Sequence, residues 1–116
     1  MNLRGVFQIL HTPFFENGDI DWSSLDRQIE FCLNAGVHGL TIPANASEFY
    51  TLTDDERFQL VERALATVGG AVPVVAGVQA PTGRAAVRFA SHAAEHGASA
   101  VMAMPPLLRN GSPPVI

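Results

Sequence analysis

The chain has 116 residues, of which 47% are hydrophobic, and these values suit one compact domain rather than a disordered polypeptide. Seven arginines against eleven acidic residues give a formal net charge of −4 and no basic stripe, so we expect no nucleic-acid partner. No apolar run approaches the roughly 20 residues of a membrane-spanning helix, so we expect no membrane partner either.

The cysteine and lysine content adds two expectations. A single cysteine, Cys32, cannot close an internal disulfide, and its apolar helical surroundings predict a buried, inert thiol. Residues 1–5 contain a charge and a glycine where a signal peptide would be apolar, so we expect a cytoplasmic location. All seven cations are arginines, so this chain has no lysine on which a Schiff base can form.

The first predicted elements are a strand and a helix. Residues 5–10 form an apolar run with β-branched and aromatic side chains, which favours a buried strand. A turn follows at Asn17-Gly18, because this pair readily supplies positive φ. From Asp21 the apolar side chains recur at helical spacing until Gly36, which is placed to end a helix in the left-handed conformation.

A second strand and helix follow. Residues 38–42 form a short strand, and we expect a loop over residues 44–52. Thr53 and Glu56 have the spacing of a capping box, which predicts the start of a helix. Gly69-Gly70 ends this helix.

The remaining residues repeat the alternation. Residues 71–78 lack polar alternation, as is typical of a strand covered on both faces. An alanine-rich helix is predicted from Pro81 to Gly97 and a fourth strand over residues 99–104. We expect an unstructured or cut-off loop over residues 107–116. The predicted order is βαβαβαβ, which indicates an α/β fold with a parallel sheet.

Two architectures fit this order, a small doubly wound sheet and part of a (β/α)8 barrel. A doubly wound nucleotide binder normally has a glycine-rich turn after its first strand, whereas this chain has His11-Thr12-Pro13-Phe14 there. This favours the barrel. A complete barrel takes about 250 residues, so we expect residues 1–116 to form a partial barrel domain with strands one to four.

Several stretches together resemble a known family. They are Phe7 through Asp21 with its Thr12-Pro13-Phe14 ending, residues 35–40, residues 73–78 and Met104-Pro105-Pro106. The chain resembles the dihydrodipicolinate synthase and N-acetylneuraminate lyase family over essentially its whole length. The resemblance implies the N-terminal half of a TIM barrel, in a cytoplasmic homo-oligomer that needs no cofactor.

The resemblance also implies a chemistry. Members of that family form a Schiff base between a barrel lysine and the ketone of pyruvate or a related 2-keto acid, and then make or break a carbon–carbon bond. The lysine and a relay tyrosine would lie on strands five and six, beyond Ile116, and Leu107 stands where an aromatic hydroxyl often joins the proton relay. We therefore expect this chain, truncated before the lysine strand, to be inactive alone.

The same resemblance assigns a substrate site. The family holds the substrate carboxylate after strand two with glycine, two hydroxyl residues, glycine and glutamate, which correspond to residues 44–48. The implied carboxylate-binding residues are Asn45, Ala46 and Ser47, supported by Glu48 and Thr12. Asn45 and Ala46 replace the two hydroxyl residues, so an amide and backbone N–H groups would have to bind the anion.

Other interpretations remain open or weak. The chain could be a noncatalytic half-barrel that self-associates or binds a partner through its sheet edges, or a small doubly wound anion binder. His92 and His96 match an inverted zinc-peptidase pattern, but no further ligand follows them, so we expect no metal. Ser47 lacks the strained elbow of a nucleophile. For Phe49 and Tyr50 we favour packing in the core over the alternative, lining a pocket.

Overall fold

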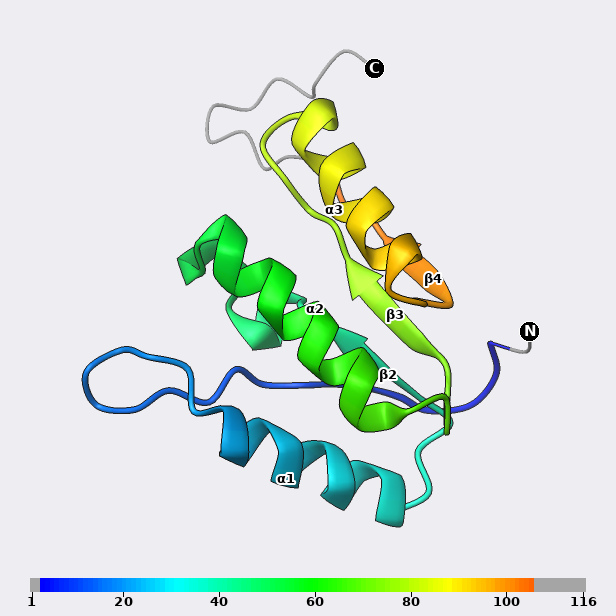
Figure 1. Cartoon of the computed structure of the whole chain (residues 1–116). Coiled ribbons are helices and arrows are strands. Elements are labelled where there is room, and N and C mark those ends of the chain that lie inside the picture. Colours follow the sequence, from blue (N-terminus) through cyan, green and yellow to red (C-terminus); the bar gives the residue numbers. More distant parts are fainter. Residues whose placement is uncertain (1–2, 106–116) are drawn as a thin grey trace.

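The structure is a computed structural model that describes residues 3–105 as a parallel sheet with helices between its strands (Figure 1). Predictions for residues 106–116, including Leu107, lie outside the described residues. The elements in chain order are β1 (Phe7–Ile9), α1 (Trp22–Asn34), β2 (Gly39–Ile42), the 3-10 turns η1 (Asn45–Ser47) and η2 (Phe49–Thr51), α2 (Asp54–Val68), β3 (Val74–Gly77), α3 (Gly83–Glu95) and β4 (Ala100–Met102).

The strands are ordered β1-β2-β3-β4, and each neighbouring pair is parallel. A doubly wound sheet reverses its strand order at a switch point, so the sequential order excludes that alternative. The helices form one layer, because α1 packs on α2 and α2 packs on α3. Sequential parallel strands under a single helical layer are the wall of a (β/α)8 barrel, as the resemblance implied.

Alternation along the strands gives the sheet two different faces. The face under the helices carries Leu40, Ile42, Val74 and Ala76, none of them more than 2% exposed. These side chains pack in two clusters with residues of the helices, such as Leu25, Ile29, Leu60, Ala64 and Ala93. Each fully buried Leu or Ile contributes about 1.5–3 kcal/mol, so this face holds the half-barrel together.

The opposite face carries a row of side chains that crosses all four strands. Ile9 is in register with Thr41, Thr41 with Val75, and Val75 with Ala100. No described helix covers this face, and three of the four residues are only half-buried. In a closed barrel, residues of this kind fill the interior in layers.

The helix ends follow the predicted signals. Asp21 caps α1 by accepting a hydrogen bond from the Ser24 N–H at 3.0 Å. Thr53 and Glu56 form the predicted capping box, with hydrogen bonds of 3.1 and 2.8 Å. Gly36 and Gly69 have φ of +85° and +59°, so the left-handed helix ends are confirmed.

An ion pair joins the first two helices. Arg63 on α2 donates to both carboxylate oxygens of Asp26 on α1, at 3.0 and 2.7 Å, and the Thr67 hydroxyl donates to the same carboxylate. The hydrogen bond from Arg63 lowers the pKa of Asp26. None of the helices described between residues 3 and 105 is long and apolar enough to cross a membrane.

Candidate functional site at the carboxyl ends of the strands

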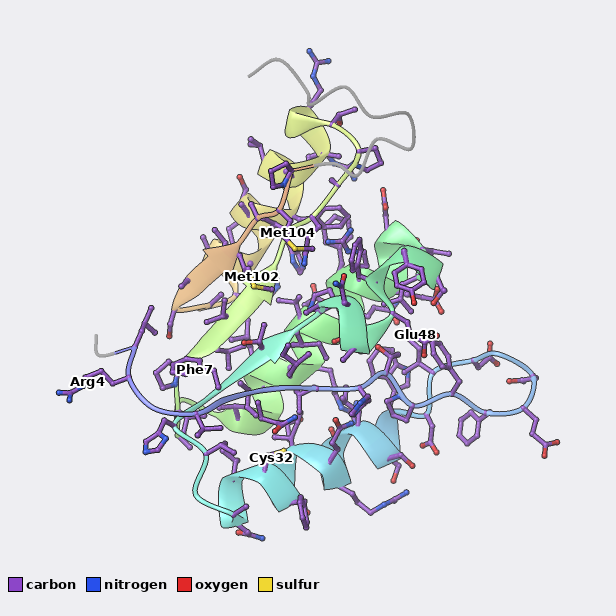
Figure 2. All side chains as sticks on the ribbon, turned by 180° about the vertical axis from the view of Figure 1, so that it is seen from behind. Arg4, Phe7, Cys32, Glu48, Met102 and Met104 are labelled. Carbon is purple, nitrogen blue, oxygen red and sulfur yellow. The ribbon has the colours of Figure 1, made fainter. Side chains whose placement is uncertain are left out.

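The loops after the four strands gather at one edge of the sheet, because parallel strands all end there. Glu48 after β2 and Met104 after β4 lie toward this edge, whereas Arg4 and Phe7 lie at the other (Figure 2). In parallel α/β folds ligands bind beyond the carboxyl ends of the strands. The five residues predicted to bind the substrate or support its site follow either β1 or β2, so they lie at this edge. They are Thr12, Asn45, Ala46, Ser47 and Glu48.

Ser47 and Thr12 tie the loops after β1 and β2 together. The Ser47 hydroxyl accepts from the Ala44 N–H at 3.0 Å and donates to the Leu10 carbonyl. The Thr12 hydroxyl donates to the Ser47 carbonyl at 2.6 Å. Thr12 and Ser47 are buried, and the Ser47 N–H donates to the Ala44 carbonyl. Both donors of Ser47 are therefore committed to the protein, which makes this residue a brace for the loop.

Asn45 and Ala46 stand at the exposed start of η1. The first N–H groups of a helical turn have no partner within the turn. Within residues 3–105, no backbone group accepts a hydrogen bond from the N–H of Asn45 or Ala46. Without a partner among the described residues, these two N–H groups and the Asn45 amide can donate to an anion.

Glu48 separates the two 3-10 turns in a left-handed conformation, with φ of 59° and ψ of 43°. Its N–H donates to the Asn45 carbonyl at 2.9 Å, and its carbonyl accepts from the Thr51 hydroxyl at 2.9 Å. Its carboxylate is exposed and makes no hydrogen bond to the part of the chain that the structure describes. Glu48 thus shapes the loop through its backbone.

A cavity of about 520 Å³ opens beside this loop. Its wall includes Asn45, Tyr50, Arg57, Gln79 and Met104. The favoured prediction that Tyr50 packs in the core is wrong, because 69% of its surface is exposed, and the structure shows the alternative, in which it lines a pocket. The reason is the reversal at Glu48, which turns the second 3-10 turn outward, so that the Tyr50 ring lines the cavity instead.

Arg57 was missed by sequence reasoning. It is 5% exposed, and its guanidinium donates to the Gln79 carbonyl at 2.6 Å and to the Gly77 carbonyl at 3.3 Å. Its charge also lies 3.8 Å above the Phe89 ring, a cation–π distance. Burial lowers the pKa of Arg57, and the nearby Asp54 opposes that shift. Arg57 braces the end of β3 and places a positive charge at the cavity wall.

Gln79 adds unpaired polar atoms to the same wall. Its side chain is 4% exposed, and neither its amide nitrogen nor its amide oxygen has a hydrogen-bond partner among the described residues. The Arg57 Nε–H is also unpartnered there. Buried polar groups are normally paired, so these enclosed atoms beside the cavity are exceptions within the described part of the chain. The sequence feature that could have indicated this polar wall is Arg57 itself, because it lies on the otherwise apolar, buried face of α2 with Leu60 and Val61.

Residues 2–115 match the model of the dihydrodipicolinate synthetase family. The chain belongs to this family.

Two curated relatives illustrate its range. The chain is 39% identical over 103 residues to the L-2-keto-3-deoxyarabonate dehydratase of Azospirillum brasilense. This alignment covers 89% of this chain and 33% of that enzyme. The chain is 35% identical over 106 residues to the 4-hydroxy-tetrahydrodipicolinate synthase of Oceanobacillus iheyensis, with 91% and 36% covered. The chain therefore spans about a third of the length of the curated relatives it matches.

Solved structures of the dihydrodipicolinate synthetase family agree with the fold. Dihydrodipicolinate synthase from Aquifex aeolicus aligns with a TM-score of 0.88 at 30% identity, over 91% of this chain and 36% of that one. A prophage protein of the same family from E. coli K12, solved in complex with pyruvate, aligns with a TM-score of 0.89 at 26% identity, over 95% and 37%. The predicted N-terminal half of a TIM barrel is confirmed.

Proposed function

We propose that this chain is the N-terminal part of a Schiff-base-forming lyase or aldolase that acts on pyruvate or a related 2-keto acid. Its part in the reaction is to hold the substrate carboxylate. The observation that carries the proposal is the pair of N–H groups of Asn45 and Ala46 without a backbone partner among the described residues, with Asn45 in the wall of a cavity that Arg57 also lines. Residues 1–116 would supply the first four strands of the barrel domain.

The residues divide into those that contact the carboxylate and those that position them. The Asn45 amide and the backbone N–H groups of Asn45 and Ala46 bind the anion, since Ala46 has no side-chain donor. Ser47 and Thr12 hold these N–H groups in place through the bonds that close the loop. Glu48 supports the same loop through its left-handed turn. Arg57 adds a charge that favours an anionic ligand.

The lysine that attacks the ketone must lie outside these 116 residues, because none of them is a lysine. Imine formation converts the substrate ketone into an electron sink, so the reaction needs no cofactor. We propose that the chain alone binds a 2-keto acid weakly and does not turn it over. The cytoplasmic location and the homo-oligomer stay predictions that belong to this proposal.

An NMR titration tests the carboxylate site. The ¹⁵N-labelled chain is titrated with pyruvate, with acetate, which keeps only the carboxylate, and with acetone, which keeps only the ketone. We expect pyruvate and acetate to shift the amide signals of Asn45 and Ala46, and acetone to leave them unchanged. Equal shifts with acetone, or shifts confined to other residues, would contradict the proposal.

A second candidate function is self-association of the half-barrel. Among the described residues, β1 and β4 each pair on one side only, and no described helix covers the face with Ile9, Thr41 and Val75. Unpaired strand edges and an uncovered apolar face favour pairing with a second copy. Sedimentation velocity over a range of concentrations distinguishes the two outcomes. A concentration-dependent dimer supports self-association, and a monomer at every concentration contradicts it.

A further inference from the structure

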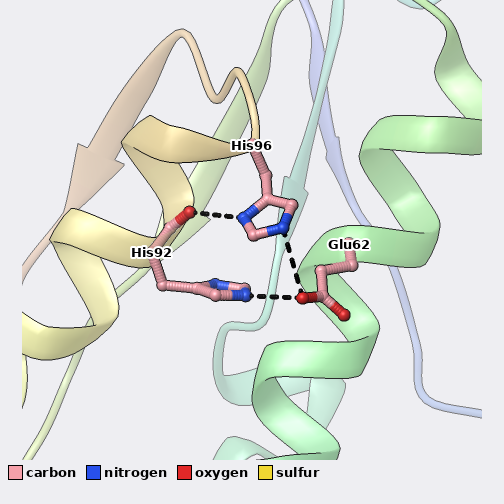
Figure 3. A group of neighbouring side chains, drawn as sticks. All are labelled: Glu62, His92 and His96. Carbon is pink, nitrogen blue, oxygen red and sulfur yellow. Dashed lines mark hydrogen bonds and ion pairs between the residues drawn. The ribbon is translucent and has the colours of Figure 1, made fainter.

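A cluster of side chains with metal-ligand atoms lies where α2 and α3 pack side by side (Figure 3). It consists of Glu62 on α2 and of His92 and His96 at the end of α3. The two histidines belong to the inverted zinc-peptidase pattern, in which no further ligand follows them in the sequence. The structure provides that ligand from upstream, 30 residues before His92.

The spacing of the three side chains matches a coordination shell. Nε2 of His92 lies 3.0 Å from a Glu62 carboxylate oxygen, and Nε2 of His96 lies 3.3 Å from the same oxygen. Two ligand atoms bound about 2.05 Å from a tetrahedral zinc ion are separated by about 3.3 Å. One ligand atom from each of the three residues lies within 4.8 Å of the others. Small side-chain rotations therefore suffice to enclose an ion.

The orientation of His96 is fixed by its other ring nitrogen. Nδ1 lies 2.8 Å from the backbone carbonyl of His92, and a carbonyl only accepts, so Nδ1–H donates to it. In a neutral His96 the lone pair is then on Nε2, which faces the Glu62 carboxylate. Metal-binding histidines are oriented in this way, by donation from the nitrogen that does not bind the ion. Two facing acceptors require a proton or a metal cation between them.

The second histidine is held by packing. The His92 ring lies 4.5 Å from the Phe58 ring and 4.3 Å from the His96 ring, measured between centroids, and its side chain is only 16% exposed. His92 lies on α3, His96 is the residue that caps the carboxyl end of α3, and Glu62 lies on α2, so the three groups are carried by two packed helices and a helix cap. Rigid supports of this kind preorganise a metal site.

We propose that Glu62, His92 and His96 bind one Zn²⁺ ion, with water as the fourth ligand, and that the ion clamps α2 to α3. Two imidazoles and one carboxylate suit zinc and its transition-metal neighbours, whereas Mg²⁺ and Ca²⁺ require oxygen ligands. The site departs from the expectation that the chain binds no metal. It does not depend on the proposed lyase function, because it shares no residue with the cavity.

Zinc titration with a chromophoric competitor tests the site, and the chain offers a matched pair of carboxylate variants. Glu62→Gln removes the ligand that the structure assigns. Glu95→Gln removes the carboxylate inside the His92–His96 sequence pattern. We expect the unmodified chain and E95Q to bind one Zn²⁺ with equal affinity, and E62Q to bind at least about tenfold more weakly, since even indirect partners of a zinc site contribute that much. Equal binding by E62Q and the unmodified chain, or a loss in E95Q as large as in E62Q, overturns the proposal.

A second readout separates a metal site from a proton held between the same groups. Co²⁺ in a tetrahedral site with nitrogen and oxygen ligands gives visible absorption bands, and Zn²⁺ displaces it. We expect these bands in the unmodified chain and their loss in His96→Gln, while His11→Gln keeps them. At the same zinc concentration, the melting temperature should also rise more in the unmodified chain than in E62Q. If cobalt gives no bands and zinc no thermal shift, the cluster holds a proton only and the proposal fails.

Discussion

Glu48 is, among residues 3–105, the one non-glycine residue with a positive φ. A left-handed L-residue costs about 1–2 kcal/mol relative to glycine, and the loop between the two 3-10 turns stores that strain. Strain of this kind concentrates at functional sites. The sequence located Glu48 in the loop through the resemblance, but no residue pattern marks a left-handed glutamate, so its conformation was not predicted.

The Glu48 strain makes a direct prediction about stability. Glu48→Gly relieves the left-handed penalty, whereas Glu48→Ala keeps it, and both remove the same exposed carboxylate. We expect the glycine variant to have a free energy of unfolding about 1 kcal/mol higher than the alanine variant. Urea denaturation of the two variants measures the difference. Equal stability would show that the loop relaxes out of this conformation.

Cys32 is 7% exposed in the cluster between α1 and the sheet, as the sequence predicted. Burial raises the pKa of its thiol above the ordinary value of 9.0. The unfolded chain therefore releases the proton at lower pH than the folded chain, and this contribution to stability is lost as pH rises from the unfolded pKa through the raised folded pKa. Cys32→Ala removes the titrating group. We expect stability to fall more between about pH 8 and about pH 10 in the unmodified chain than in the variant, on denaturation at both values. Parallel declines would contradict a raised pKa.

At the scale of elements, capping residues and glycines predicted the three helices to within a few residues. The strands are shorter than predicted, because the backbone ladder covers only three or four residues of each apolar run. Residues 44–52 were predicted as a loop and contain two 3-10 turns. Those turns are set by long-range hydrogen bonds from Ser47 and Thr12 to other loops, which sequence periodicity does not reveal.

Ser47 therefore has a role that a substitution can isolate. Ser47→Ala leaves the Ala44 N–H and the Leu10 carbonyl without their buried partner. We expect a loss of about 1–3 kcal/mol in the free energy of unfolding. Ser91→Ala, on the exposed surface of α3, is the matched control and should change stability by less than about 0.5 kcal/mol. A neutral Ser47→Ala would mean that the hydroxyl does not hold the loop.

Arg57 and Gln79 show what the sequence could not supply at this scale. Both are polar residues that the fold buries beside the cavity, from α2 and from the end of β3. An arginine on an otherwise apolar helix face is a visible anomaly, but its partners are backbone carbonyls that only the packing of α2 on the sheet brings within reach. The element order was predictable from local patterns, whereas this polar wall was not.

On the scale of the whole molecule, the chain is a segment of barrel wall. Parallel pairing follows from the βαβαβαβ alternation, because a strand that returns through a helical crossover runs parallel to the strand before it. The alternation alone left a doubly wound sheet open, and the strand order excluded it. Among the described strands the edges β1 and β4 do not meet, so the barrel is not closed by these residues.

The open edge yields a prediction about assembly. Val101 on β4 and Val87 on α3 are both exposed, at 47% and 64%. A lysine on an edge strand opposes strand pairing between copies. If the chain self-associates through β4, Val101→Lys should weaken the dimer, and Val87→Lys should leave it unchanged, as sedimentation velocity would show. Equal effects of the two lysines would place the contact elsewhere.

The central claim is that the chain holds the carboxylate of a 2-keto acid and that the imine-forming lysine belongs to a different part of the barrel. Borohydride reduction in the presence of pyruvate, followed by peptide mapping by mass spectrometry, tests it most directly. A full-length protein of the family serves as the control, and the proposal predicts a reduced adduct on one of its lysines. The account predicts no adduct on any side chain of residues 1–116. A reduced pyruvate adduct on an internal residue of this chain would contradict it.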